Sequence, residues 1–359
     1  MTGNPASHLT ADCLDNGKRL RSGWAGGEGL IASEEDRQIV QIDCDAKAAW
    51  SEPLAGVQRE LLGAHFLLLG RLLRKSARVD FVGVEPENVM ERRILLTLFR
   101  LEEVRVSELA NMLGNDVSQV SRALRAGRAG GMVERERQRD PYRLTDKGRA
   151  IGERIEQVAM RREAALTRGL GPSDMFELAG LLGNLMEKAA AILAAESAKA
   201  RDGGDAEDLG TPVFPEIPSR VQPTVINLAT TILRGATLSF KRLTGISNYE
   251  WRILANIAYR PSIPFMELVN HVDSDKAQVS RALDAMVGAQ LLSRNKAGRN
   301  QPVRFDMTGK GRRIHEIMQE DALRRNVLLV EGLRPVQRRR LQSYLDLLIA
   351  NATAMAERS

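Results

Sequence analysis

The sequence predicts a mainly α-helical protein with small β-hairpins, in which one structural unit occurs twice. Three observations support this prediction. Aromatic residues make up only 4 % of the chain, whereas alanine, leucine, arginine and glutamate, which favour helices, are abundant. Apolar residues recur at helical spacing in several long stretches. Two long segments on either side of a proline-containing stretch also match each other, motif by motif.

The internal repeat preserves the order of five separate motifs. The first three motifs recur 159 residues later in the chain, and the last two recur 163 residues later. In order, the matching segments are 91–95 (ERRIL) and 250–254 (EWRIL), 108–111 (ELAN) and 267–270 (ELVN), 118–124 (SQVSRAL) and 277–283 (AQVSRAL), 144–148 (LTDKG) and 307–311 (MTGKG), and 169–172 (GLGP) and 332–335 (GLRP). The constant offset within each group of motifs indicates a duplication, with four residues added to the second copy after the third motif.

Each copy opens with a long amphipathic helix that has one broad apolar stripe. The stripe residues are Leu61, Leu62, Leu68, Leu69, Leu72 and Leu73 in the first copy, and Val225, Leu228, Ile232, Ala236 and Phe240 in the second. A second helix is predicted at residues 91–101 and 249–259. A short helix follows at residues 107–113, with Ser107 as its N-cap, and at residues 265–272.

A tight turn and a third helix come next in each copy. The third helix is predicted to begin at Asn115 or Asp116, and at Ser274 or Asp275 in the second copy, because these residue types cap helix N-termini. One face of this helix is apolar, and the other carries glutamine, serine and arginine. The apolar residues are Val120, Ala123 and Leu124, and their counterparts Val279, Ala282 and Leu283. A short helix followed by such a third helix is typical of a helix-turn-helix.

Two apolar-ended strands around a charged tip then predict a two-stranded wing in each copy. The strands are expected at 132–133 and 142–144 around the tip 134–140, and at 291–292 and 303–307 around the tip 293–301. Further helices close each copy, at 145–168 and 173–198 in the first and at 336–357 in the second. The fold class is therefore mainly α with small β wings, as two winged helix-turn-helix units.

The domain organisation follows from the repeat. Residues 1–52 are rich in Gly, Ser, Asp and Asn and are interpreted as a loosely ordered N-terminal arm, with one short helix or strand near residues 37–42. The first unit spans 53–198 and the second spans 223–359. The proline-containing stretch between them, 199–222, is interpreted as a linker.

The composition argues against several classes of protein. The two cysteines, Cys13 and Cys44, cannot form a disulfide framework, and the four histidines show no metal-ligand spacing. No carboxylate pair stands out for acid–base catalysis, so we expect neither an enzyme nor a bound cofactor or metal. No apolar run approaches about 18 residues, and the first residues lack the features of a secretion signal, so we expect a cytoplasmic protein without a membrane span.

The order of these motifs resembles the MarR family of transcription regulators. The resemblance rests on 251–254 (WRIL), the two VSR segments, the Thr-x-Lys-Gly after each wing and the Gly-Leu-x-Pro before each last helix. It implies a helical dimerisation region built from the first and last helices, a homodimer on a near-palindromic operator, and release by a small, often aromatic or phenolic ligand. Two copies in one chain also allow an intrachain pseudo-dimer. The family's acidic residue near the wing arginine is missing at 299–301 (RNQ), and the first wing is about four residues shorter than the second. Minor-groove insertion is therefore in doubt for both wings, and it is least expected for the first.

A net charge of +6 and a pI of about 9.5 make a polyanionic partner plausible, and the front of each third helix offers a surface for double-stranded DNA. The glutamines can read adenine and the arginines guanine or phosphate, whereas the alternative is an ordinary polar surface. The wing cations can contact DNA or simply be solvated. The candidate DNA-binding residues are Ser118, Gln119, Ser121, Arg122, Arg125, Arg135 and Arg137, and Lys276, Ala277, Gln278, Ser280, Arg281, Arg294, Lys296 and Arg299. His65 is expected in the core or at the surface rather than facing a ligand.

Three functions remain open at this point. The first is a sequence-specific transcription regulator, acting as a repressor relieved by a small, aromatic ligand on an imperfect palindromic operator. The second is a plasmid-type replication initiator, which also carries two winged helices in one chain. The third is an enzyme with an accessory winged helix, but no segment remains to build a catalytic domain. The long terminal helices of both copies favour the first.

Overall fold

The computed structural model describes residues 54, 56–113, 115, 117–202, 220–272, 274–295 and 303–357. The predicted N-terminal arm, the helix cap Asp116 and the wing residues Lys296 and Arg299 lie outside the described residues. The predictions made for them stay predictions.

The first copy contains seven helical segments and three short strands among its described residues. In order they are η2 (Gly56–Glu60), α3 (Leu62–Asp80), α4 (Val89–Leu101), β1 (Glu103–Val104), α5 (Val106–Leu113), α6 (Val117–Ala129), β2 (Val133–Glu134), β3 (Tyr142–Leu144), α7 (Asp146–Leu166) and α8 (Pro172–Asp202). The strands form an antiparallel sheet in the order β1-β3-β2. The pair β2–β3 is the predicted wing, whereas strand β1 was not expected from the sequence.

The second copy repeats this order of helices. Its elements are α9 (Val221–Thr244), α10 (Asn248–Tyr259), α11 (Phe265–Val272), α12 (Lys276–Gly288), β4 (Leu292–Asn295), β5 (Arg304–Met307), α13 (Gly309–Val330) and α14 (Pro335–Glu357). Strands β4 and β5 pair antiparallel, with Leu292 opposite Met307. The predicted fold class, mainly helical with two winged helix-turn-helix units, is confirmed.

Two local predictions differ from the structure. Ser107 lies inside α5 rather than capping it, because the helix begins at Val106 and the carboxylate of Glu108 accepts the backbone N–H of Arg105 instead. Both ends of the predicted linker are helical, since α8 continues to Asp202 and α9 begins at Val221. Proline is tolerated in the first turn of a helix, where its missing N–H has no intrahelical partner, so Pro223 does not prevent α9 from starting there.

The break before each last helix explains the Gly-Leu-x-Pro motif. Gly169 and Gly332 have φ angles of +94° and +79°, which side chains other than glycine rarely adopt. Pro172 and Pro335 are the first residues of α8 and α14, the helix position that proline favours. The motif therefore ends one helix and starts the next in both copies.

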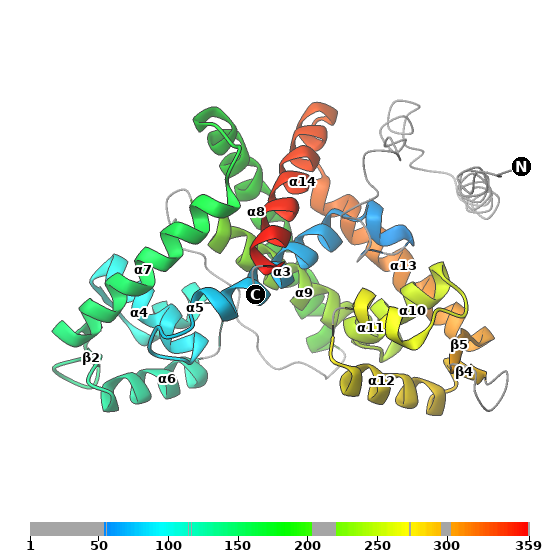
Figure 1. The fold of residues 1–359 in the computed structure, drawn as a ribbon, viewed down its shortest axis with the longest axis horizontal. Coiled ribbons are helices and arrows are strands. Elements are labelled where there is room, and N and C mark those ends of the chain that lie inside the picture. The colour runs from blue at the N-terminus through cyan, green and yellow to red at the C-terminus, as the bar shows by residue number, and fades with distance from the viewer. Residues whose placement is uncertain are drawn as a thin grey trace, which may run out of the picture. The chain divides into compact units, whose positions relative to one another are not determined.

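The first helix of each copy packs against the last helix of the other copy. Helix α3 lies along α14, α9 lies along α8, and α3 and α9 also pack against each other (Figure 1). Helix α7 contacts α14 in the same way as α13 contacts α8. Exchanging the two copies maps the α3–α14 contact onto the α9–α8 contact and the α7–α14 contact onto the α13–α8 contact. The α3–α9 contact maps onto itself, so these helices have the contact pattern of a two-fold dimer.

Most residues of the apolar stripes predicted from the sequence lie in the core of this region, whereas Leu61, Ala236 and Phe240 lie in the core of the second winged unit. The fully buried residues include Phe66 and Leu69 of α3, Leu185 of α8, Leu228 of α9 and Leu348 of α14. The part of each stripe in this core is buried against helices of the other copy, which removes apolar surface that either copy alone would expose.

Backbone capping repeats the same exchange. The side-chain oxygen of Asn326 in α13 accepts the N–H of Leu62 at 2.9 Å, at the start of α3. The carboxylate of Glu163 in α7 accepts the N–H groups of Val221 and Gln222 at 2.6 and 3.0 Å, at the start of α9. Each first helix is therefore capped by the other copy, and free helix N–H groups that would otherwise be buried unpaired are satisfied.

One described helix, Pro172–Ala200 within α8, is long and apolar enough to cross a membrane by length and composition alone. One third of this apolar window is buried, and its buried residues include Leu178, Leu181, Leu182, Leu185 and Ala189 in the core formed with the neighbouring helices.

Candidate nucleic-acid interface

The third helix of each unit, α6 and α12, separates an apolar rear from a polar front. Val120 and Leu124 of α6 and Val279 and Leu283 of α12 are buried in the two small cores. The candidate residues on the front are exposed, except that Ser121 is half-buried. The exposed residues are Ser118, Gln119, Arg122 and Arg125 on α6, and Lys276, Ala277, Gln278, Ser280 and Arg281 on α12.

The front glutamines are held in equivalent ways. The side-chain amide of Asn115 donates to Oε1 of Gln119 at 3.0 Å, and the hydroxyl of Ser274 donates to Oε1 of Gln278 at 2.7 Å. Asp275 also caps α12, because its Oδ1 accepts the N–H of Gln278 at 2.8 Å. These contacts orient the front of the helix before any partner arrives.

Two arginines of the repeated ERRIL and EWRIL motifs fix the turn before this helix. Nη2 of Arg93 donates to the carbonyl of Leu113 at 2.9 Å, and a guanidinium nitrogen of Arg252 donates to the carbonyl of Val272. Burial lowers the pKa of the Arg93 guanidinium. Sequence analysis found these arginines only as a repeat, whereas the structure shows that they close the C-terminal end of the short helix.

The Thr-x-Lys-Gly motif joins each wing to the helix that follows it. In the first copy Thr145 caps α7, its Oγ1 donates to the carbonyl of Gly131 at 2.7 Å, and Lys147 donates to the carbonyl of Gly130 at 2.8 Å. A Cβ on Gly148 would lie 1.8 Å from the carbonyl oxygen of Met132, so only glycine fits.

The second copy repeats this junction. Thr308 caps α13, Lys310 donates to the carbonyl of Ala289, and a Cβ on Gly311 would lie 2.1 Å from the carbonyl oxygen of Leu291. The motif therefore sets the wing at a fixed angle to the third helix in both units.

In the first unit, the wing and α6 enclose a basic hollow. The guanidinium of Arg135 lies over the ring of Tyr142, 4.7 Å from its centroid. The hollow has a volume of about 340 Å³, and Arg122, Arg125 and Arg135 all line it, together with Ser118 and Ser121. The structure thus brings together five of the candidate residues. Arg137 does not line the hollow and lies at the wing tip, where its backbone N–H donates to the carboxylate of Asp140.

In the second unit, a carboxylate occupies the corresponding place. Asp284 on α12 pairs with Arg294 of the wing, and this guanidinium lies 5.6 Å from the centroid of the Phe305 ring. From the sequence, Arg294 is a candidate for DNA contact or for simple solvation, and nothing there indicates Asp284 as its partner.

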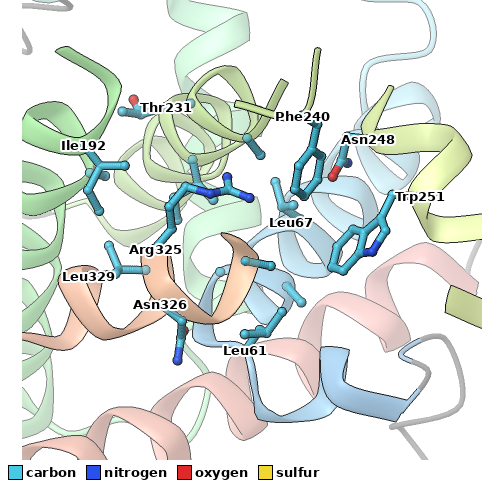
Figure 2. A pocket seen from close by; sticks show the side chains of 17 residues that line it. Leu61, Leu67, Ile192, Thr231, Phe240, Asn248, Trp251, Arg325, Asn326 and Leu329 are labelled. Carbon is cyan, nitrogen blue, oxygen red and sulfur yellow. The ribbon is translucent and has the colours of Figure 1, made fainter. Parts of the chain in front are cut away.

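A mainly apolar pocket of about 70 Å³ lies where the second winged unit meets the helical region (Figure 2). This volume exceeds the roughly 10–15 Å³ that one water requires. Residues from both copies line it. They include Leu61 and Leu67 from the η2–α3 segment, Ile192 from α8, Phe240 from α9, Trp251 from α10, and Arg325 and Leu329 from α13. No prediction from the sequence pointed to this pocket.

The aromatic centre of the pocket has a different counterpart in the first copy. Phe240 lies between Trp251, at 5.2 Å between ring centroids, and the guanidinium of Arg325, at 4.7 Å. The equivalent Phe81 lies near two guanidinium groups, those of Arg92 at 5.0 Å and Arg162 at 6.0 Å. An arginine therefore replaces the tryptophan, and the first-copy counterpart is more highly charged.

His65 and possible metal ligands were the other candidates for chemistry at these surfaces. His65 is buried, its Nδ1 lies 3.0 Å from the carbonyl oxygen of Leu61, and it does not line the pocket. Within the described part of the chain, no group of three or more His, Cys, Asp or Glu side chains could hold a metal ion.

Comparison with known proteins gives one family match. Residues 246–301, a range that includes α10, α11, α12 and β4, match the model of the MarR family. No curated protein sequence matches the chain.

Several solved structures are similar at low scores. A MarR/EmrR family transcriptional regulator from Acinetobacter sp. ADP1 shares 20 % identity over 33 % of this chain and 84 % of its own, with a TM-score of 0.31. A MarR family regulator from Silicibacter pomeroyi shares 20 % sequence identity over 36 % of this chain and 89 % of its own, with a TM-score of 0.32. A MarR protein from Peptoclostridium difficile shares 16 % sequence identity over 41 % of this chain and 95 % of its own, with a TM-score of 0.36. These TM-scores are too low to establish a common fold. The winged helix units are identified instead by the order and pairing of their own helices and strands.

Proposed function

We propose that the chain is a sequence-specific regulator of transcription of the MarR type, in which two winged helix units of one chain bind double-stranded DNA together. One observation carries the proposal above the others. The same glutamine and arginine stand on the exposed front of both third helices, at Gln119 and Arg122 and at Gln278 and Arg281, opposite a buried apolar face. A polar helix front of this kind next to a wing is suited to the major groove.

The exchanged helices support the pseudo-dimer half of the proposal. The packing of α3 on α14 and of α9 on α8, together with the crossed caps at Leu62 and Val221, repeats what two chains of a homodimer would do. One chain can then present its two third helices to successive major grooves, roughly 34–36 Å apart along the duplex. Because the two fronts differ, at Lys276 for example, the operator would be an imperfect palindrome.

The experiment is a salt titration of DNA binding. Several Lys/Arg–phosphate contacts in each unit should give a slope of log Kobs against log [salt] of about −5 or steeper, at roughly −0.9 per phosphate neutralised. On a site selected from random sequence, Arg122→Ala and Arg281→Ala should each weaken binding by about 1–3 kcal/mol without changing the melting temperature. A slope near zero on every duplex refutes DNA binding. Normal affinity with early melting would assign that arginine to the fold instead.

The regulatory half of the proposal is that a small aromatic molecule in the pocket relieves repression. The pocket supports this because its walls come from the helical region and from α10 and α13 of the second winged unit, so an occupant contacts both. The indole N–H of Trp251 is buried and has no hydrogen-bond partner within the described chain, so it can donate to a ligand oxygen.

The pocket is tested with phenol, benzoate and indole as probes. Bound probe should raise the melting temperature and weaken binding to the selected site, and Trp251→Leu should remove both effects. Arg92→Leu, at the counterpart position in the first copy, is the matched control and should leave both effects in place. Effects that survive Trp251→Leu would show that the probes act elsewhere.

A further inference from the structure

The two recognition helices carry side chains of opposite charge at one pair of equivalent positions. Arg125 is the ninth residue of α6, and Asp284 is the ninth residue of α12, which has the same length. Both side chains are exposed on the side that faces the wing. The wing residue opposite is an arginine in both units, Arg135 in the first and Arg294 in the second. Between the third helix and the wing, the first unit therefore has two cations, whereas the second unit has an ion pair.

Helix α6 as a whole is also more positively charged than helix α12. Helix α6 contains three arginines and no acidic residue, whereas α12 contains one lysine, one arginine and Asp284. In the first unit the wing carboxylates Glu134 and Glu136 are paired with Arg143, at 3.2 and 2.8 Å, and not with the arginines of the hollow. Among the described residues, no carboxylate lies within ion-pair distance of Arg122 or Arg125.

The attraction of each surface for DNA phosphates depends on the number of cations that are not paired with carboxylates. Each phosphate neutralised by Lys or Arg releases counterions and adds about −0.9 to the salt slope. Asp284 repels phosphate and also occupies Arg294, so it weakens two positions of the second surface at once. In the first surface the equivalent arginines, Arg125 and Arg135, both line the open basic hollow.

We infer that the first winged unit is the main DNA anchor of the chain, and that the exchange of Arg125 for Asp284 sets this inequality between the two halves. This inference rests on the proposed DNA binding. The first unit supplies most of the sequence-independent affinity. The second unit binds its half-site weakly and adds its contribution once the first unit is in place.

The test uses charge reversals at the two equivalent positions and a random-sequence duplex of about 30 base pairs. Arg125→Asp should weaken binding on the order of tenfold and make the salt slope shallower by about 0.9–1.8, because the new carboxylate removes one cation and can pair with Arg135. Asp284→Arg should strengthen binding and steepen the slope by about the same amount, because it adds a cation and releases Arg294. Glu357→Arg, at the end of α14, is the control for net charge and should change neither value.

A second duplex of about 12 base pairs, long enough for only one recognition helix, tests which half is the anchor. Arg122→Ala should remove most of the binding to this duplex, and Arg281→Ala should remove little. In the double variant Arg125→Asp/Asp284→Arg, which keeps the net charge of the parent, this order should reverse. Circular dichroism melting of every variant shows whether it is folded.

The outcomes separate this inference from the function on which it rests. A parent chain that binds no duplex refutes the proposed function and this inference with it. A parent that binds with equal losses from Arg122→Ala and Arg281→Ala on the short duplex overturns the inference alone. Asp284→Arg that binds a selected site less tightly, with no gain on random sequence, would mean that Asp284 reads a base and would also overturn it.

Discussion

Glu196 offers a stringent test of the packing between the two copies. Its side chain lies on α8 of the first copy and is 2 % exposed. Oε2 accepts from Arg242 of α9 at 2.8 Å, and Oε1 accepts from Arg324 of α13 at 3.2 Å and from Lys199 at 2.9 Å. Burial alone would raise the pKa of this carboxyl, but the three cations together outweigh it and lower the pKa from 4.5 to about 2.

The size of the effect follows from this shift. A displacement from 4.5 to about 2 corresponds to about 3 kcal/mol in favour of the charged, folded form. Because the three cations are between one third and one half exposed, solvent screening reduces the contribution to about 1–3 kcal/mol. We therefore expect Glu196→Gln to lower the free energy of unfolding by that amount near neutral pH.

The pH dependence has a definite sign. The folded pKa is depressed, so the contribution is fully present above the unfolded value of 4.5 and is lost as the pH falls towards about 2. Urea unfolding of the parent and of Glu196→Gln should differ most near pH 7 and less at about pH 3. Glu136→Gln, which removes an exposed partner of Arg143, is the control and should have no measurable effect. A difference that stays constant or grows at low pH would refute the reasoning.

Two further predictions concern the wing junction and the linker. Gly148→Ala and Gly311→Ala should each destabilise the chain by about 2 kcal/mol or more in thermal melts, because the added Cβ meets a carbonyl oxygen. Gly183→Ala in α8 is the control, because no atom lies within 4 Å of the added Cβ. This substitution should be neutral or stabilising by about 0.5–1 kcal/mol. Equal effects at all three glycines would contradict the role assigned to the motif. Cleavage at a protease site introduced between α8 and α9 should leave the two halves associated in gel filtration, since α3 and α9 are buried against helices of the other copy. Halves that separate freely would point instead to pairing between chains.

Much of the fold could be predicted from the sequence because its strongest signals are periodic and repeated. The leucine stripe of the first helix and its counterpart around Leu228 each require a partner surface, and the duplication offered one within the chain. The Thr-x-Lys-Gly repeat was visible without a structure, but its reason was not. Only the carbonyl of Met132 beside Gly148 shows why no side chain fits there.

The features that the sequence did not reveal depend on pairs that are distant in the chain or on very short elements. Strand β1 contains two residues, too few for any alternation to appear. The pairing of Asp284 with Arg294 depends on where the wing crosses the helix, and the pocket around Trp251 requires helices from both copies. Among the candidate residues, Lys296 and Arg299 lie outside the described chain, and their part in DNA binding stays a prediction.

The central claim is that one chain places two recognition helices on one duplex. The most direct measurement is the mass of the complex with a selected operator, by light scattering, combined with a hydroxyl-radical footprint of the same complex. The account predicts one chain per duplex and two protected segments about one helical turn apart. Two chains per duplex, each protecting a single segment, would contradict it.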